Sequence, residues 1–170
     1  MEQLLKQAEL FEGLREEDLS RLTAIGRRQA LRAGEYLILL GGDALDFYVV
    51  TKGKLELCFP MPIGADVRDI AVESIGPGKA LGWSALVRPY RFTLSARAVE
   101  PSEVVAFARR ALIDVFEREP RLGYTFFMKI SELIGIRLET FQALWVRELR
   151  RLAERPSEWP RGAEASRGRQ

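Results

Sequence analysis

The spacing of apolar residues changes twice along the chain, and the changes predict a helical start, a middle part built of strands and a helical end. Between residues 4 and 30 the spacing is helical, because Leu19, Leu22 and Ile25 recur at three-residue steps after a break at Gly13. We therefore expect amphipathic helices ahead of the strands.

From Leu31 the apolar residues follow the two-residue period of strands. Turn-forming residues separate the runs at Gly34, at Gly41-Gly42-Asp43 and at Lys52-Gly53. The predicted strands cover residues 36–40, 47–51, 54–59, 67–75 and 103–107, with residues 60–66 as a looped connection. Several short strands at this spacing are typical of an antiparallel sandwich or barrel.

The chain becomes helical again from Arg109. A short helix is predicted at residues 111–117, ending near Pro120, and a long helix at residues 121–154. The long helix repeats apolar residues at three- and four-residue steps, at Phe127, Ile134, Leu138, Phe141, Trp145 and Leu152. This repeat is typical of a coiled coil of two helices, and a helix of this length has more apolar surface than one small barrel can cover. We therefore expect a homodimer whose interface includes Ile134, Leu138, Phe141 and Trp145.

The last residues differ from the rest of the chain. Residues 156–170 are rich in Pro, Gly, Ser and charge and are expected to be a disordered tail, so that the predicted domain covers residues 1–155. Seven arginines lie between Arg147 and Arg169. They are either a solvated helix face with a solubilising tail or a contact for nucleic acid or an acidic partner.

Composition narrows the class of function. Hydrophobic residues make up 47% and charged residues 29% of the 170 residues, and the net charge of +2 is too balanced to indicate nucleic acid by itself. The single cysteine, Cys58, excludes an intramolecular disulfide, which fits a reducing compartment and a cytoplasmic location. The chain has no histidine and no apolar run of the roughly 20 residues that span a bilayer. We therefore expect neither an enzyme nor a metal site nor a membrane segment.

The candidate chemistry lies in residues 76–98, which read GPGKALGWSALVRPYRFTLSARA. A glycine-rich turn leads into a compact segment at residues 81–87, and residues 91–98 then alternate as a strand. In that strand Phe92, Leu94, Ala96 and Ala98 share one face, and Arg91, Thr93, Ser95 and Arg97 share the other. A short helical turn joined by a loop to a strand makes a concave site for an anion.

This segment resembles the phosphate-binding cassette of cyclic nucleotide-binding domains, found in the catabolite-activator (Crp/Fnr) superfamily and in cyclic nucleotide-dependent kinases. In that family a Gly-Glu pair opens a short helix and the Glu binds the ribose 2′-hydroxyl. An Arg six residues before a terminal Ala pairs with the cyclic phosphate. Gly82 and Ala98 match the two ends of this pattern.

The resemblance implies an α+β fold: an antiparallel β-roll (a jelly-roll-like double-stranded barrel) with N-terminal helices and a long C-terminal dimerisation helix. The strand region supports it, because Gly34-Glu35, Gly42-Asp43, Phe47-Tyr48 and Gly53 occur in the family's order. The corresponding set of ligand-binding residues is Gly82, Trp83, Ser84, Ala85, Arg91, Phe92 and Thr93.

The cassette departs from the family at its two most important positions. Trp83 replaces the ribose-binding Glu, and Phe92 replaces the phosphate-binding Arg, with Arg91 one position earlier. Since a one-residue slip reverses the face of a strand, Arg91 is either an anion ligand reached through a distorted loop or a surface arginine beside a buried Phe92. We expect weak or no binding of cyclic AMP. No cofactor is indicated with certainty, and the candidate ligands are a cyclic nucleotide or another small anionic molecule.

Two functions remain open. The first is a stand-alone sensor domain: a homodimer that responds to a small effector, without the helix-turn-helix domain of catabolite activators and therefore without specific DNA binding. Its output would pass through a downstream protein partner or through the dimer helix. The second is a non-binding interaction or scaffold dimer of the same fold, whose pocket is plugged by Trp83, Tyr90 and Phe92.

Overall fold

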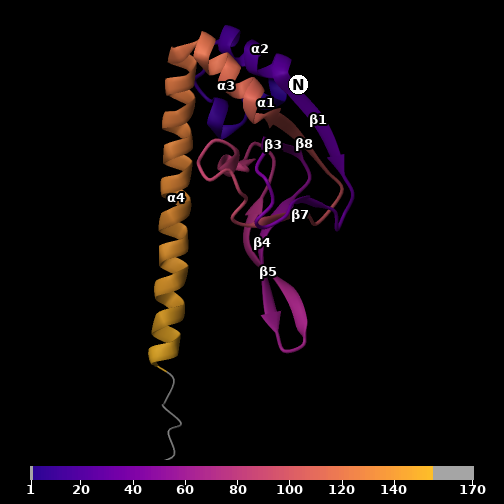
Figure 1. Ribbon diagram of the computed structural model, residues 1–170, viewed down its shortest axis with the longest axis vertical. Helices are drawn as coiled ribbons and strands as arrows, with labels where there is room; N and C mark the ends of the chain where they lie inside the picture. The colour runs from indigo at the N-terminus through magenta and orange to yellow at the C-terminus, as the bar shows by residue number, and fades with distance from the viewer. Residues whose placement is uncertain (1, 155–170) are drawn as a thin grey trace, which may run out of the picture. The chain divides into compact units, whose positions relative to one another are not determined.

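The computed structural model describes residues 2–154, so the predicted tail at residues 156–170 and its arginines lie outside the described part. The described part of the chain divides after Ile130 into two compact units. The first unit holds all of the strands and most of the helices (Figure 1). It opens with three short helical segments: α1 (Glu2–Lys6), the 3₁₀ turn η1 (Glu9–Phe11) and α2 (Glu16–Ile25).

Within residues 2–154 eight strands follow, and they form two antiparallel four-stranded sheets. The first sheet has the order β1-β8-β3-β6, formed by Gly26–Leu31, Ser102–Ala108, Asp46–Lys52 and Ala80–Leu81. The second has the order β2-β7-β4-β5, formed by Tyr36–Ile38, Ser95–Ala98, Leu55–Ile63 and Asp66–Ile75. The prediction of an α+β fold with an antiparallel β-roll and N-terminal helices is therefore confirmed.

Strand β1 corrects the sequence analysis, which extended the helical pattern to Ala30. The chain leaves the helix at Gly26 and pairs with β8 from Gly26–Phe107 to Leu31–Ser102. A Cβ atom at position 26 would lie 2.8 Å from Cγ1 of Val105, so only glycine allows this close approach. The strand depends on a partner that is distant in the sequence, which local periodicity does not reveal.

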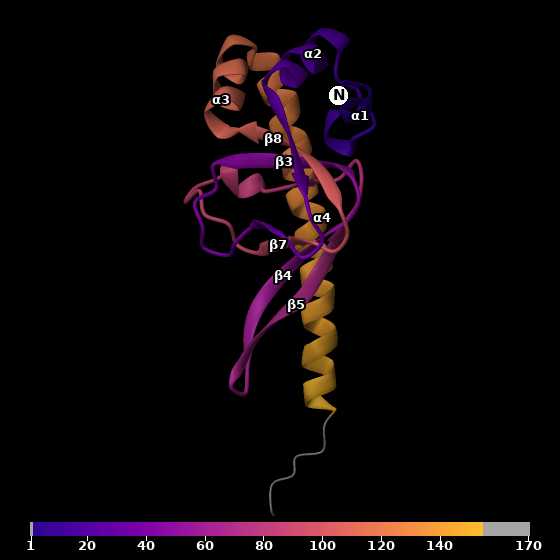
Figure 2. The same cartoon turned by 90° about the vertical axis from the view of Figure 1, so that its right-hand side faces the viewer.

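The β4–β5 hairpin is longer than predicted. Residues 60–66 were expected to be a loop, but β4 continues to Ile63 and turns at Gly64, whose φ is 65°. Strand β7 pairs with β4 only as far as Cys58, so that β4 beyond it has one free edge that tolerates Pro60 and Pro62. The hairpin therefore projects beyond the rest of its sheet (Figure 2).

A cluster of phenylalanines forms the centre of the first unit. Phe47 from β3, Phe107 from β8 and Phe126 from the last helix are fully buried. Phe11 and Phe116 complete the cluster, with ring centroids 5.8 Å from Phe107 and 4.9 Å from Phe126. By packing against one another, these rings connect the N-terminal helices and the helices after β8 to the first sheet.

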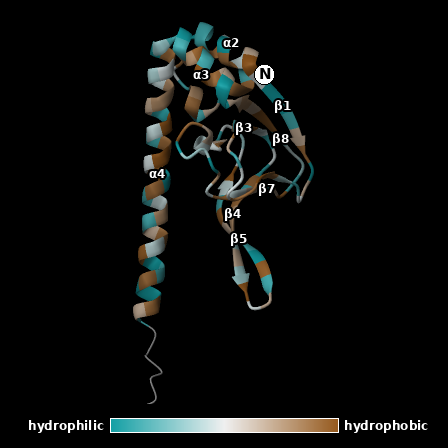
Figure 3. Cartoon of the chain, in the orientation of Figure 1, coloured by the Kyte–Doolittle hydropathy of each residue, from teal (hydrophilic) through white to brown (hydrophobic). Residues whose placement is uncertain are grey.

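Two helices follow β8, as predicted: α3 (Arg109–Arg118) and α4 (Pro120–Ala153). Helix α4 is 34 residues long, and apolar and polar residues alternate along it (Figure 3). In its second part, Leu138, Phe141 and Trp145 are 56%, 41% and 67% exposed, and Ile134 is partly exposed. The long C-terminal helix is thus present, and its role as a dimer interface stays a prediction. No helix in the part from 2 to 154 has both the length and the apolar character needed to cross a bilayer.

Candidate effector-binding site

The short helix of the cassette is a single 3₁₀ turn, η2 (Trp83–Ala85), that starts from a glycine with left-handed backbone angles. Gly82 has φ 79°, and a Cβ atom there would lie 3.1 Å from Cδ2 of Tyr48 and 3.2 Å from the carbonyl oxygen of Asp46. Glycine is therefore required both by the backbone angle and by the close approach of β3. Ser84 and Ala85 are buried behind it.

Arg91 is held by the loop between β2 and β3. Its Nη1 donates a hydrogen bond to the carbonyl oxygen of Gly41 at 2.8 Å, and its Nη2 lies 3.4 Å from Oδ1 of Asp43. The Arg91 side chain is 61% exposed. Its backbone forms an isolated antiparallel bridge with Asp43, so the predicted strand at residues 91–98 is regular only from Ser95.

Phe92 turns the other way and is buried, with 9% of its surface exposed. Its ring lies between two glycines: Cε1 is 3.5 Å from the Cβ position of Gly82, and Cδ2 is 4.0 Å from that of Gly42. Both backbone polar groups of Phe92 are hydrogen-bonded to the loop between β2 and β3: Phe92 N donates to Gly42 O at 3.0 Å, and Gly41 N donates to Phe92 O at 2.8 Å. An aromatic ring therefore lies beside Gly82 at the position where the family pattern has the phosphate-binding arginine.

Tyr90 makes a contact that sequence reasoning missed. Its φ is 61°, a left-handed conformation that is rare for a large side chain. The guanidinium carbon of Arg109, the first residue of α3, lies 4.4 Å from the centre of the Tyr90 ring. Arg109 also donates to the carbonyl oxygen of Ala44 at 3.3 Å. Tyr90 therefore joins the cassette to α3, and no sequence pattern connects these two positions.

The remaining predicted residues of the site are not joined by side-chain hydrogen bonds. Trp83 is partly exposed and Thr93 is exposed. Tyr48, which borders Gly82, has its pKa raised to about 12, chiefly by burial and then by the charge of Asp46, so its phenol is neutral at physiological pH. Within residues 2–154 no group of three or more Cys, Asp and Glu side chains is placed to hold a metal ion.

Comparison with known proteins decides the family. Residues 28–119 match the cyclic nucleotide-binding domain family, which is more than half of the chain. The chain belongs to this family. The β-roll and the position of the cassette are thus family features, whereas Trp83 and Phe92 are departures from the family pattern described above.

The relatives share this domain and differ elsewhere. The cyclic AMP receptor protein of Thermus thermophilus is 28% identical over 120 residues, which cover 71% of this chain and 54% of the relative. The human patatin-like phospholipase domain-containing protein 6 is 31% identical over 126 residues, but these cover 68% of this chain and only 9% of the phospholipase. Because the match covers so little of the phospholipase, it gives no evidence that this chain has the enzymatic activity of that protein.

A solved structure extends the comparison. The putative cyclic nucleotide-binding protein of Geobacter metallireducens matches with a TM-score of 0.67 and 25% identity. The match covers 79% of this chain and 95% of that protein. Together with the family match, this agreement identifies the chain as a sensor or regulatory domain of the cyclic nucleotide-binding type.

Proposed function

We propose that this domain is a homodimeric effector sensor that binds cyclic AMP and cyclic GMP weakly or not at all, because its cassette has lost both polar anchors of the family. The observation that carries the proposal is the placement of residues 91 and 92. Arg91 is engaged with Gly41 and Asp43, and the buried Phe92 ring lies beside Gly82.

The chemistry of the two departures supports this proposal. A cyclic phosphate in the family pairs with arginine, and a charge-assisted bidentate pair is the strongest polar contact such a site offers. A phenylalanine ring donates no hydrogen bond, and a phosphate buried against it would lose water without replacement. Trp83 likewise accepts no hydrogen bond from a ribose hydroxyl. Losing both anchors weakens binding by about 10³- to 10⁴-fold.

The proposed effector is a different small anion with a flat part. The indole of Trp83 would stack on the flat part, and the ligand would contact the set named above: Gly82, Trp83, Ser84, Ala85, Arg91, Phe92 and Thr93. Arg91 would have to leave Asp43, an exchange between exposed partners that costs little. The proposal includes no sequence-specific DNA binding and no catalysis.

One observation favours a second function, an interaction or scaffold dimer that binds no effector. The Phe92 ring is 9% exposed and in contact distance of the glycine that opens the short helix, so it already fills space beside the cassette. In that function the surface of the dimer, rather than a ligand, would carry the signal to a partner protein.

Calorimetric titration of cyclic AMP tests the proposal. The wild type is expected to give no saturable heat at micromolar ligand, and Arg91→Ala is expected to behave in the same way. The double variant Trp83→Glu with Phe92→Arg restores the family pattern and is expected to gain binding, with its thermal unfolding midpoint as a check on folding. Low-micromolar binding by the wild type that is lost in Arg91→Ala would overturn the proposal.

A further inference from the structure

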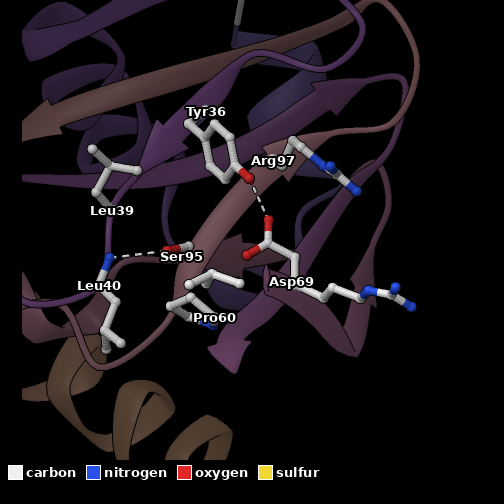
Figure 4. A pocket seen from close by; sticks show the side chains of 9 residues that line it. Tyr36, Leu39, Leu40, Pro60, Asp69, Ser95 and Arg97 are labelled. Carbon is white, nitrogen blue, oxygen red and sulfur yellow. Dashed lines mark hydrogen bonds between the residues drawn. The ribbon is translucent and has the colours of Figure 1, made fainter. Parts of the chain in front are cut away.

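A second concave surface, separate from the cassette, lies on the β2-β7-β4-β5 sheet (Figure 4). This outer groove has a volume of about 680 Å³, and the residues that border it include Tyr36, Leu39, Leu40, Arg68, Asp69 and Arg97. The volume lies within the range of small-molecule sites. None of these residues belongs to the set proposed for the effector.

The strand register places the groove on the outer face of the sheet. In β7 the fully buried Ala96 and Ala98 point into the roll, and Arg97 between them points outward. Arg97 is paired with Tyr36 of β2 and with Glu56 of β4. The groove and the roll interior therefore lie on opposite sides of the same strand.

A hydrogen bond spans the sheet at one end of the groove. The Tyr36 hydroxyl donates to Oδ2 of Asp69, and so joins β2 and β5, the two edge strands of the sheet (Figure 4). This bond is the first cause of a raised pKa at Tyr36, so the phenol remains a donor to a higher pH than a free tyrosine does. A hydrogen bond from a neutral hydroxyl leaves the charge of a carboxylate in place, but two arginines of the border, Arg68 and Arg97, outnumber Asp69.

The border carries two cationic side chains, Arg68 and Arg97. Arg97 is the one that lies over the Tyr36 ring. Its guanidinium carbon lies 5.9 Å from the centre of the Tyr36 ring, and among the described residues it forms no ion pair with a carboxylate. A guanidinium fixed over a ring keeps its N–H donors directed at solvent, where they can bind a carboxylate in a bidentate manner.

Apolar side chains form the rest of the border. Leu39 is 61% exposed, Val67 71% and Leu40 37%. A ligand that covered these apolar side chains would bury their surface from water, which favours binding. Figure 4 shows Leu39 and Leu40 across the groove from Asp69, with Pro60 between them. The lining therefore combines two arginines and one carboxylate with an aliphatic wall.

We propose that the outer groove binds a small amphiphilic anion, a carboxylate on an aliphatic body, with the carboxylate at Arg97 and the body along Leu39 and Leu40. This ligand matches both the charge and the apolar wall, whereas a cation would meet two arginines, Arg68 and Arg97, against one carboxylate, Asp69. The proposal does not depend on what the cassette binds.

The groove shares a loop with the cassette. Leu40 N donates to Oγ of Ser95 at 3.0 Å on the groove side, and the next residues, Gly41 and Gly42, hold the backbone of Phe92. A ligand against Leu39 and Leu40 therefore contacts the segment that positions Phe92, and the amide signals of Gly41 and Gly42 are sensitive reporters of binding.

The test is an NMR titration of the ¹⁵N-labelled full chain with octanoate, with n-octyltrimethylammonium as a cation of the same chain length. Octanoate is expected to shift the amide signals of residues 39–42 and 95–97 in a saturable manner, and the ammonium is expected to leave them in place. Equal effects of the two amphiphiles, or octanoate shifts confined to the exposed apolar residues of α4, would overturn the proposal.

Two variants locate the binding groups. Arg97→Gln is expected to weaken octanoate binding about tenfold or more by removing the charge-assisted contact, and Leu39→Asn about fivefold by removing apolar cover. Leu39 is largely exposed, so its variant retains the fold even where Arg97→Gln disturbs the sheet. Arg28→Gln, on the exposed part of β1, is the matched control and should bind as the wild type does. Unchanged affinity in both groove variants would rule the site out.

Discussion

Arg91 and Phe92 are neighbours in the sequence whose side chains have opposite environments, and their energies explain which of the two is buried. An exposed ion pair such as Arg91–Asp43 contributes about 0–1 kcal/mol, since both side chains are more than half exposed. Burial of a phenylalanine side chain contributes about 1.5–3 kcal/mol. Burial of Phe92 therefore contributes more free energy than the ion pair of Arg91. Arg91 lies at the surface, where it contacts Gly41 and Asp43.

Cys58 gives a residue-scale prediction about alkaline pH. Burial first, and then the nearby Asp69 carboxylate, raises the pKa of its thiol to about 11. The unfolded chain releases this proton at a pKa of about 8.5, so above that pH the unfolded state binds fewer protons than the folded state. The contribution of Cys58 to stability is therefore complete below about pH 8.5 and is lost as the pH rises towards 11.

Denaturant unfolding from pH 7 to pH 10 measures this effect. The free energy of unfolding should fall by about 1–2 kcal/mol between pH 8.5 and 10, at roughly 1.4 kcal/mol per pH unit. In the isosteric variant Cys58→Ser this fall should be absent over the same interval. Tyr48, with a pKa of about 12, adds a further loss only above pH 10, where free tyrosine begins to ionise. An equal fall in both proteins would show that Cys58 is not the cause.

At the scale of elements, the corner between α3 and α4 depends on one close approach. Glu119 separates the two helices, and the first turn of α4 crosses α3 at Gly123. A Cβ atom at Gly123 would lie 2.9 Å from Cβ of Phe116, closer than such atoms come in folded proteins. Phe116 in turn contacts Phe126 of the central cluster, so the corner is fixed to the core of the first unit.

The two glycines within α4 provide a matched pair of variants. Gly123→Ala should destabilise the protein by about 2 kcal/mol or more, because the methyl group must push α3 away from the cluster. Gly135→Ala has open space around the new methyl group and should stabilise the helix by up to about 1 kcal/mol, because alanine favours helix more than glycine does. Thermal unfolding should therefore shift in opposite directions for the two variants, and a shift in the same direction would contradict this account of the corner.

At the scale of the whole molecule, the cassette, helix α3 and helix α4 follow one another along a short path. Tyr90 contacts Arg109 at the start of α3, and α3 leads directly into α4. A change at the cassette therefore has a physical route to the long helix, on which the proposed homodimer depends.

Sedimentation velocity tests this homodimer. Burying Leu138, Phe141 and Trp145 against a second copy contributes about 1.5–3 kcal/mol for each side chain, enough to hold a dimer at micromolar concentration. The double variant Leu138→Glu with Phe141→Glu should be monomeric, because it places charges in the seam.

The matched control adds the same two charges elsewhere on the same helix. Thr140→Glu with Ala143→Glu lies at exposed positions outside the repeat of apolar residues and should leave the dimer intact. A monomeric wild type at micromolar concentration would refute the predicted interface.

The sequence by itself determined the fold, the place of the cassette and its chemical departures from the family. These features are local: a two-residue or a helical period identifies most of the elements, and Gly82, Trp83 and Phe92 stand at fixed distances from Ala98. The long helix was predicted to within one residue at each end, since its apolar repeat continues for its whole length.

Only the tertiary structure decided where the side chains of the cassette go. Arg91 meets Gly41 and Asp43, which lie about fifty residues earlier, and Tyr90 meets Arg109 at the start of α3. Strand β1 likewise exists because β8 pairs with it, and the outer groove is bordered by residues that the pairing of β2, β7, β4 and β5 brings together. Such contacts depend on the register between strands that are distant in the sequence, and the local spacing of apolar and polar residues contains no information about that register.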